Sequence, residues 1–302
     1  MRIDRLAVGV GAQKAGTTWL FDQLDRRSDI YSPPEKEVHY FDYVHLETKW
    51  LSRTRDRVLR DYAATSPQEV RDFAQGRRIE DERTRAALLF SLGKVDDAWY
   101  TQVLSNENGA WSIDITPAYA LLPEDGYRHM RSLASEFRCF FVMRNPVDRS
   151  LSQLRFSHRP DVREKMGLAP MKLSELSVDE IKAKLQSPGF EARSNYIETI
   201  RRLKACLSAD EVSFVFYEDL VRDPVSFVGN ILSLLEISPS GESEIDRSAV
   251  NPSPGTDLDE SIRPFLRERY RDMVREIDSV LGRIPAEWER EFFSRAADVP
   301  QR

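Results

Sequence analysis

Residues 11–18 read Gly-Ala-Gln-Lys-Ala-Gly-Thr-Thr, a spacing of glycines, lysine and hydroxyl groups that is typical of a phosphate-binding loop. The two glycines and the last threonine fit the P-loop pattern G-x-x-x-x-G-K-[ST]. Thr17, however, stands where nucleoside triphosphatases carry a lysine, and Lys14 lies inside the loop instead. We therefore expect the loop to bind a phosphate group, whereas a nucleoside triphosphate is disfavoured as its ligand.

A second candidate group is the segment Arg-Asn-Pro-Val-Asp-Arg-Ser-Leu-Ser, which runs from Arg144 to Ser152. It follows the apolar residues 139–143, so Arg144 falls at the carboxyl end of a predicted strand. Ser152 lies two helical turns further along, on the same side of a predicted helix. The two side chains could together hold a second phosphate group. The alternative is a surface arginine before an ordinary helix.

A third candidate group follows the predicted strand at residues 30–31 and reads Pro-Pro-Glu-Lys-Glu-Val-His-Tyr-Phe. Glu37 and His39 are the candidate general bases in it, because a carboxylate and an imidazole can each accept a proton from a hydroxyl group. The alternative is a polar loop before a helix, with Tyr40 and Phe41 in the core.

The elements that must position these groups are short apolar runs, which predict strands. The runs cover residues 6–10, 30–31, 111–115, 139–143 and 212–216. Helical patterns lie between them, so the sequence predicts an α/β fold with a P-loop-like parallel β-sheet flanked by helices. Each candidate group follows a strand and should therefore lie at the carboxyl edge of the sheet.

Two long regions fall outside this alternation. Residues 46–104 contain no strong strand pattern, and their apolar residues recur at roughly helical spacing, which predicts a helical insertion within a single domain of residues 1–302. Residues 155–193 are rich in proline and glycine, and we expect an irregular lid or binding loop there. Further helices are expected from Ser194 to about residue 207, from Pro224 to 235 and from 259 to 280.

Composition limits the class of protein. The chain has 302 residues, 41% of them hydrophobic and 31% charged, as is ordinary for a globular enzyme. Its net charge of −6 argues against general nucleic-acid binding. Cys139 and Cys206 are expected to be buried free thiols. No apolar run approaches a membrane span, and the first strand begins almost at once, so we expect a cytoplasmic protein.

Taken together, the three groups resemble a sulfotransferase that uses 3′-phosphoadenosine 5′-phosphosulfate (PAPS). The segments GAQKAGTTWL, EKEVHYFD and RNPVDRSLSQ carry the resemblance, and they occur in the family's order and spacing. The segments TPAY at 116–119, RSNY at 193–196 and FYEDL at 216–220 extend it over most of the chain. The resemblance implies the sulfotransferase fold, and the glutamate-histidine segment is closest to the heparan-sulfate and other glycan-type members.

The family's roles transfer to matching positions. The residues implied to bind the donor are Lys14, Ala15, Gly16, Thr17, Thr18, Trp19, Arg144, Ser152 and Tyr196. Within this set, Arg144 and Ser152 would hold the 3′-phosphate, and Lys14 would also stabilise charge on the bridging oxygen. Glu37 matches the catalytic base of the glycan branch, and His39 would be a supporting contact. The resemblance implies no metal, and residues 251–255 (Asn-Pro-Ser-Pro-Gly) match a donor-covering loop or form a plain connector.

The acceptor stays open. Glycan sulfotransferases usually carry a lysine before the T-P-x-Y segment, whereas Ile115 stands there in this chain, with Asp114 before it. A strongly anionic sugar polymer is therefore disfavoured, and a sugar, a natural product, a lipid or a peptide tyrosine remain as acceptors, by O- or N-sulfation. The insertion at residues 46–104 is expected to line the acceptor site or to form a contact in a homo-oligomer.

Two other functions compete with sulfuryl transfer. A P-loop kinase would need a lysine at position 17 and a magnesium-binding acid at a strand end, for which Asp114 is the candidate. A catalytically inactive binding protein on the same fold is the other possibility. The presence of a candidate base, a loop lysine and both phosphate groups favours an enzyme over that alternative.

Overall fold

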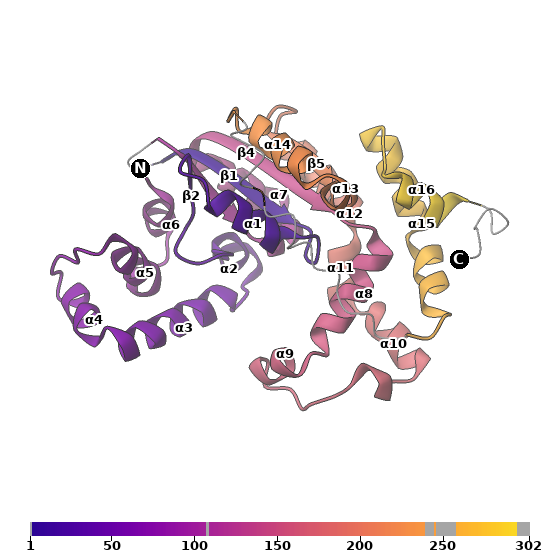
Figure 1. Ribbon diagram of the computed structural model, residues 1–302, viewed down its shortest axis with the longest axis horizontal. Helices are drawn as coiled ribbons and strands as arrows, with labels where there is room; N and C mark the ends of the chain where they lie inside the picture. The colour runs from indigo at the N-terminus through magenta and orange to yellow at the C-terminus, as the bar shows by residue number, and fades with distance from the viewer. Residues whose placement is uncertain (1, 107–108, 239–244, 246–257, 295–302) are drawn as a thin grey trace.

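The protein is described by a computed structural model that covers residues 2–106, 109–238, 245 and 258–294. Five parallel strands form one sheet in the order β2-β3-β1-β4-β5. The strands are β1 (Ile3–Gly11), β2 (Ile30–Tyr31), β3 (Trp111–Ile115), β4 (Ala134–Met143) and β5 (Val212–Phe216). All five predicted strands are present, and the predicted α/β architecture with a P-loop-like parallel sheet is confirmed (Figure 1).

The helices of the described chain alternate with these strands or extend beyond them. They are α1 (Thr17–Asp25), α2 (Tyr40–Leu46), α3 (Trp50–Thr65), α4 (Pro67–Ala74), α5 (Glu82–Leu92), α6 (Asp97–Leu104), α7 (Glu124–Ser132), α8 (Pro146–Ser157), α9 (Pro160–Lys165), α10 (Val178–Leu185), α11 (Pro188–Ser194), α12 (Tyr196–Cys206), α13 (Tyr217–Arg222), α14 (Pro224–Leu234), α15 (Ile262–Leu281) and α16 (Ala286–Phe293). Two short 3₁₀ helices are η1 (Pro117–Leu121) and η2 (Leu173–Glu175).

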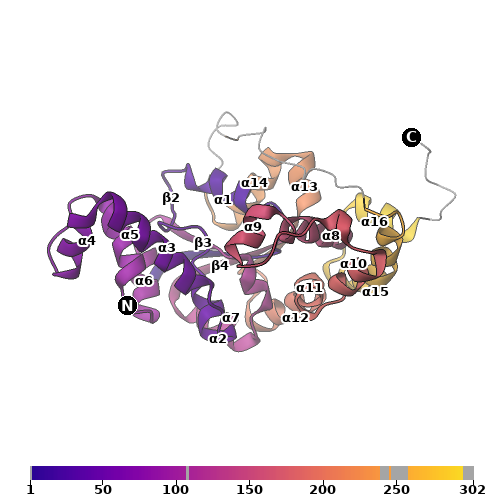
Figure 2. The ribbon, with the colours of Figure 1, turned by 90° about the horizontal axis from the view of Figure 1, so that it is seen from below.

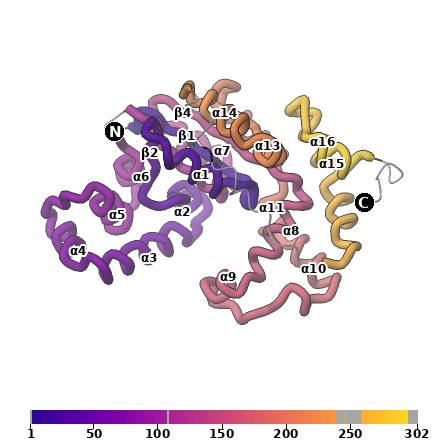
Figure 3. Tube along the Cα trace, in the orientation of Figure 1, coloured from indigo at the N-terminus to yellow at the C-terminus, as the bar shows by residue number. Residues whose placement is uncertain are grey.

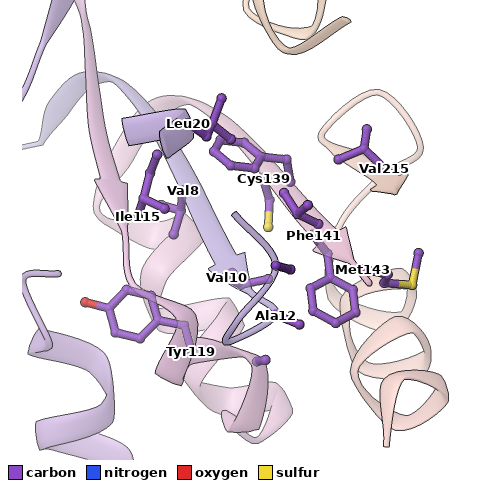
Figure 4. Packing of buried hydrophobic residues seen from close by; sticks show 14 of the residues in the cluster. Val8, Val10, Ala12, Leu20, Ile115, Tyr119, Cys139, Phe141, Met143 and Val215 are labelled. Atoms are coloured by element: carbon purple, nitrogen blue, oxygen red, sulfur yellow. The ribbon is translucent and has the colours of Figure 1, made fainter. Parts of the chain in front are cut away.

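The central strands β1 and β4 form the core because helices cover the sheet on both faces. From Leu6 onward every β1 residue is buried, and the last residues of β4 are buried as well. Figure 4 shows the side chains of Val8, Val10 and Phe141 packed in this core. A continuous apolar run, rather than an alternating one, is what a strand buried on both faces requires.

The helices form two layers with extensions at both ends. Seen from below, α1, α13 and α14 lie on one face of the sheet, and α2, α7 and α12 lie on the other (Figure 2). The helices α3 to α6 lie at one end of the molecule, and α10, α15 and α16 lie at the opposite end in both views (Figures 1 and 2). The sheet that carries the candidate site residues is therefore covered by helices on both faces and flanked by further helices at both ends of the molecule.

Helices α3 to α6 occupy the region predicted as a helical insertion, and residues 50–104 contain no strand. These helices join the main hydrophobic core through residues such as Phe90 and Trp99, whose ring centroids lie 5.6 Å apart. Arg55 of α3 donates a 2.8 Å hydrogen bond to the carbonyl oxygen of Ser91 at the end of α5. The Cα trace in Figure 3 shows α3 running from beside α2 toward α4 at this end of the molecule.

The prediction of one irregular region at residues 155–193 is wrong in part, because α9, α10 and α11 form within it. Pro160 and Pro188 each occupy the first position of a helix, where the missing N–H has no intrahelical partner to lose. Ser177 caps α10, and its hydroxyl accepts from the backbone N–H of Glu180. The prolines therefore start helices here instead of interrupting them.

Two further expectations can be compared with the structure. Cys139 is buried as expected, but Cys206 is only half-buried at the end of α12, and both thiols are free. Among the residues that the structure covers, no helix combines the length and the apolar character needed to cross a membrane.

Candidate active site

The candidate residues lie in loops that leave the carboxyl ends of three strands. Lys14 follows β1, Glu37 follows β2 and Arg144 follows β4. The chain fills the sheet on one side of β1 first and then crosses to β4 on its other side, so β1 and β4 flank the point where the strand order reverses. Open parallel sheets bind ligands at such a point.

The loop after β1 is shaped to present backbone N–H groups to an anion. Gly16 precedes α1 with a φ of 79°, a left-handed conformation that glycine adopts without strain. A Cβ atom at Gly16 would lie 2.8 Å from Leu220 Cδ2 and 3.1 Å from the Tyr217 ring, so a larger residue does not fit. Because the first N–H groups of α1 lack intrahelical partners, this cradle can accept a phosphate.

Lys14 stands at the centre of the loop in a strained conformation, with a φ of 72°. Its carbonyl oxygen accepts a 3.0 Å hydrogen bond from Arg144 Nη1, which joins the first phosphate loop to the second candidate group. Its Nζ lies 4.0 Å from the centroid of the Phe156 ring on α8. Burial lowers the pKa of Lys14, and the positive charges of Arg144 and Arg159 lower it further.

Arg144 is held in place by contacts from three directions. Its guanidinium lies 4.6 Å from the centroid of the Tyr217 ring. Tyr196 donates a 2.9 Å hydrogen bond from its hydroxyl to the Arg144 carbonyl oxygen. The next residue, Asn145, donates its backbone N–H to Glu218 Oε1 at 2.8 Å, and burial raises the pKa of Glu218 to about 7. Tyr217 thus helps to orient the arginine.

The other implied donor-binding residues differ in what they expose. Thr18 is exposed at the start of α1, whereas Thr17 is buried beside it. Ser152 is buried in α8, two turns after Arg144. The side chains of Ala15, Trp19 and Tyr196 are buried as well. They therefore support the site by packing in the core and holding the backbone in position. Residues 251–255, the expected donor-covering loop, lie outside the described residues.

Glu37, His39 and Asp42 form a line of three ionisable groups. His39 Nε2 lies 3.3 Å from Glu37 Oε2, and His39 Nδ1 lies 3.1 Å from each carboxylate oxygen of Asp42. The Nζ of Lys36 donates to Glu37 Oε1 at 2.6 Å. Asp42 is completely buried and accepts a 2.5 Å hydrogen bond from the Thr48 hydroxyl. Asp42 was not predicted as a site residue, although it ends the EKEVHYFD segment.

This geometry assigns the charge of His39. Both ring nitrogens face carboxylate oxygens, which only accept, so both nitrogens must donate and the ring is an imidazolium. Despite the opposing effect of burial, the hydrogen bonds to Asp42 and Glu37 raise the pKa of His39 to about 9. The hydrogen bond from His39 and the charge of Lys36 lower the pKa of Glu37 to about 2 against the same effect. At neutral pH, Glu37 can accept a proton and His39 cannot.

The loop that carries these residues has a strained backbone, and hydrogen bonds to buried side chains hold it in place. Among the described non-glycine residues, five have positive φ angles: Lys14, Glu37, His39, Glu47 and Glu236. Three of the five are the predicted catalytic residues, which fits the tendency of backbone strain to concentrate at functional sites. Asp114 Oδ1 accepts from the Val38 backbone N–H at 3.4 Å, and the Tyr119 hydroxyl accepts from the Tyr40 N–H at 3.0 Å.

Asp114 anchors the loop through a network of buried hydrogen bonds. Its carboxylate is completely buried and accepts hydrogen bonds from the hydroxyls of Thr116, Tyr119 and Tyr100, at 2.6, 2.8 and 3.1 Å. Burial raises its pKa. All of these partners are protein groups, so the candidate acid of the kinase alternative already takes part in holding the loop of Glu37 and His39.

The pairing of His39 predicts how stability depends on pH. The folded-state pKa of His39, about 9, exceeds its ordinary value of 6.5, so its contribution is complete below about 6.5 and is lost as the pH rises through 9. We expect the wild type to exceed His39→Gln in free energy of unfolding at about pH 6, and the difference to shrink at about pH 10. Urea unfolding at both pH values measures it, and a difference independent of pH would contradict the charge assignment.

Comparison with known proteins agrees with this geometry. The family model described as Sulfotransferase domain matches residues 7–251. The chain therefore belongs to the sulfotransferase domain family, and it is an enzyme of the sulfuryl-transfer class. A comparison with curated proteins gave no match.

Solved structures support the fold. The chain is similar to a sulfotransferase from Alicyclobacillus acidocaldarius, with a TM-score of 0.56 and 18% identity over 96% of this chain and 100% of that one. The sulfotransferase domain of the Synechococcus PCC 7002 olefin synthase gives a TM-score of 0.53 and 18% identity, over 94% of this chain and 98% of that domain. The sulfotransferase domain of the curacin biosynthetic pathway gives a TM-score of 0.52 and 15% identity, over 94% of this chain and 99% of that domain. At these identities the likeness concerns the fold.

Proposed function

We propose that the protein transfers a sulfuryl group from PAPS to an acceptor hydroxyl or amine. The observation that carries the proposal is the convergence of two candidate phosphate-binding groups, Lys14 with the α1 N-terminus and Arg144 with α8, near the carboxylate of Glu37. The donor supplies the sulfuryl group. Lys14 would stabilise the charge that grows on the oxygen bridging sulfur and phosphorus, and Glu37 would take the acceptor proton.

The chain's own features fit this donor. A Cβ atom at Gly16 would meet Leu220 and Tyr217, so glycine lets the loop keep the left-handed turn whose N–H groups would cradle the 5′-phosphate. The guanidinium of Arg144 donates to the carbonyl oxygen of Lys14, so the two candidate loops lie side by side, and a ligand held by both through phosphate groups would need two separated anionic groups. A nucleotide with both 3′- and 5′-phosphates meets that requirement. Asp114 is enclosed by protein donors, which removes the kinase alternative's candidate ligand for magnesium.

The donor is tested by comparing nucleotides. We expect the wild type to bind 3′-phosphoadenosine 5′-phosphate (PAP) more tightly than AMP, because AMP lacks the 3′-phosphate. Arg144→Ala should weaken PAP binding about 10- to 100-fold through the loss of a charge-assisted contact, and it should change AMP binding little. Isothermal titration calorimetry measures both affinities. Equal affinity of the wild type for PAP and AMP would reject the donor, and a strict magnesium requirement for turnover would revive the kinase function.

Helix α3 is positioned to contribute to the acceptor site. Trp50, Arg53 and Arg57 lie on one face of α3, at positions i, i+3 and i+7. Arg57 Nη2 lies 2.6 Å from Glu35 Oε2, and the Trp50 ring stacks on His39 with centroids 6.2 Å apart. The exposed face of α3 therefore follows the loop that carries Glu37. We propose that this part of the 46–104 insertion lines the acceptor site.

Trp50 is the residue through which this proposal is tested. Trp50 is 41% exposed although it packs beside His39, so its indole can contact an acceptor ring. Trp50→Ala should raise the acceptor KM about tenfold and leave the Kd for PAP unchanged. The acceptor would come from a PAPS-dependent mass-spectrometric screen of sugars, phenols, lipids and peptides. Phe293→Ala is the control, because Phe293 is 39% exposed on α16; equal effects of both changes would contradict the proposal.

A further inference from the structure

Arg149 is a fully buried cation on α8. Its side chain has no solvent exposure, although arginine is almost never found in that state without a partner. Its Nη2 donates to the hydroxyl of Ser194 at 2.6 Å and to the hydroxyl of Ser150 at 3.1 Å. The remaining nitrogens, Nε and Nη1, are buried and make no hydrogen bond.

No carboxylate of the described chain neutralises this charge. Besides burial, the main influences on the pKa of Arg149 are the neutral phenols Tyr196 and Tyr270, the second also through a hydrogen bond, and the cation Arg144. A guanidinium remains protonated in proteins even where burial lowers its pKa, as it does here. An unpaired buried charge is strongly destabilising unless a negative charge offsets it. A bound anion is therefore the natural counter-charge for Arg149.

The hydroxyl groups around Arg149 have hydrogen-bond partners other than the arginine. The Ser194 hydroxyl donates to the Phe190 carbonyl oxygen at 2.8 Å and accepts from the Tyr270 hydroxyl at 3.1 Å. The Ser150 hydroxyl lies 3.0 Å from the same Tyr270 oxygen. These three hydroxyls would keep hydrogen-bond partners if the arginine were removed. A purely structural role, in which the guanidinium satisfies buried polar groups, is therefore a weak explanation for it.

The position of Arg149 indicates which ligand charge it faces. Its backbone N–H donates to the Asn145 carbonyl oxygen at 2.8 Å in the first turn of α8. Ser152 follows three residues later, and both side chains are buried, so they share one face of the helix. Arg144 precedes the same helix and is close enough to repel Arg149. The buried cation thus stands behind the two residues proposed to hold the 3′-phosphate.

We infer that Arg149 is a positioning residue that supplies a buried, unpaired positive charge behind the Arg144 and Ser152 site, and that the donor's 3′-phosphate dianion is its counter-charge. The inference rests on the proposed function. Arg149 acts through the field and the arrangement of α8 and not by touching the donor. Because the surrounding interior screens charge much less than water does, a cation there favours a dianion more strongly than a surface cation would.

The test separates this role from a structural one through two quantities, the melting temperature without ligand and the affinity for PAP. Arg149→Met removes the charge and keeps an unbranched side chain in the core. We expect its melting temperature without ligand to equal or exceed that of the wild type, because a buried unpaired charge is gone. We expect its affinity for PAP to fall about tenfold, with its affinity for AMP nearly unchanged. Differential scanning fluorimetry and calorimetric titration give the two readouts.

Two variants serve as controls. Arg149→Lys keeps the charge and should retain most of the preference for PAP over AMP. Arg163→Met removes another buried arginine, whose Nε donates to the Ala169 carbonyl oxygen, and should leave the preference intact. A PAP preference that survives Arg149→Met, or a lowered melting temperature with unchanged affinities, would overturn the inference and leave the donor assignment standing. Equal binding of PAP and AMP by the wild type would reject the donor, and the inference with it.

Discussion

Replacing Glu37 with glutamine should lower kcat by about 100-fold or more, the usual contribution of a general base. The substitution keeps the shape of the side chain and removes its ability to accept a proton. His39 holds Glu37 ionised at neutral pH with a pKa of about 2, so Glu37 is a weak base toward an alcohol in the ground state. Its effect must come late in the reaction, when sulfur–oxygen bond formation makes the acceptor proton acidic. The Kd for PAP should be nearly unchanged.

The matched variant for this prediction is His39→Ala. His39 is a cation below about pH 9, so it orients Glu37 and does not compete for the proton. Its removal should lower kcat less than Glu37→Gln does, chiefly because the loop loses a contact to Asp42. Steady-state kinetics at neutral pH compares the two. If His39→Ala abolished turnover and Glu37→Gln largely preserved it, the histidine would be the base.

Lys14→Ala should also lower kcat by about 100-fold or more, with a much smaller effect on the Kd for PAP. PAP has no sulfuryl group to transfer, so its affinity reports ground-state binding alone. The Lys14 charge matters most when the bridging oxygen becomes negative during transfer. Burial and the nearby cations Arg144 and Arg159 make this ammonium group electrostatically strained without a ligand, which favours its pairing with an anion.

The outcome that would refute this role is a large loss of PAP affinity with kcat at saturation nearly unchanged, because that pattern marks a contact made equally in the ground state and in the transition state. Single-turnover measurements separate the chemical step from product release and should show the same loss as kcat. Lys14 Nζ lies 4.0 Å from the centroid of the Phe156 ring, and we expect the lysine to turn from that ring toward the donor's bridging oxygen. A structure with bound PAP would test that movement directly.

The placement of Lys14, Glu37 and Arg144 at one edge of the sheet followed from the sequence, because it depends on local patterns. A buried strand requires an uninterrupted apolar run, and a phosphate cradle requires glycine at a left-handed position such as Gly16. The family resemblance added the expected roles of these residues. The start of α9 at Pro160 was missed because a proline favours the first position of a helix as well as a break.

The charges of the site were decided only by the tertiary structure. Sequence proximity put His39 near Glu37, but the imidazolium also depends on a completely buried Asp42 and on an αL backbone at residue 39. Asp114 reaches the Val38 N–H across 76 residues of sequence, which turns a candidate metal ligand into an anchor for the loop. Hydrogen-bond partners and screening are properties of the packed interior, and no local pattern encodes them. For the same reason the unpaired charge of Arg149 emerges only when every group packed around α8 is known.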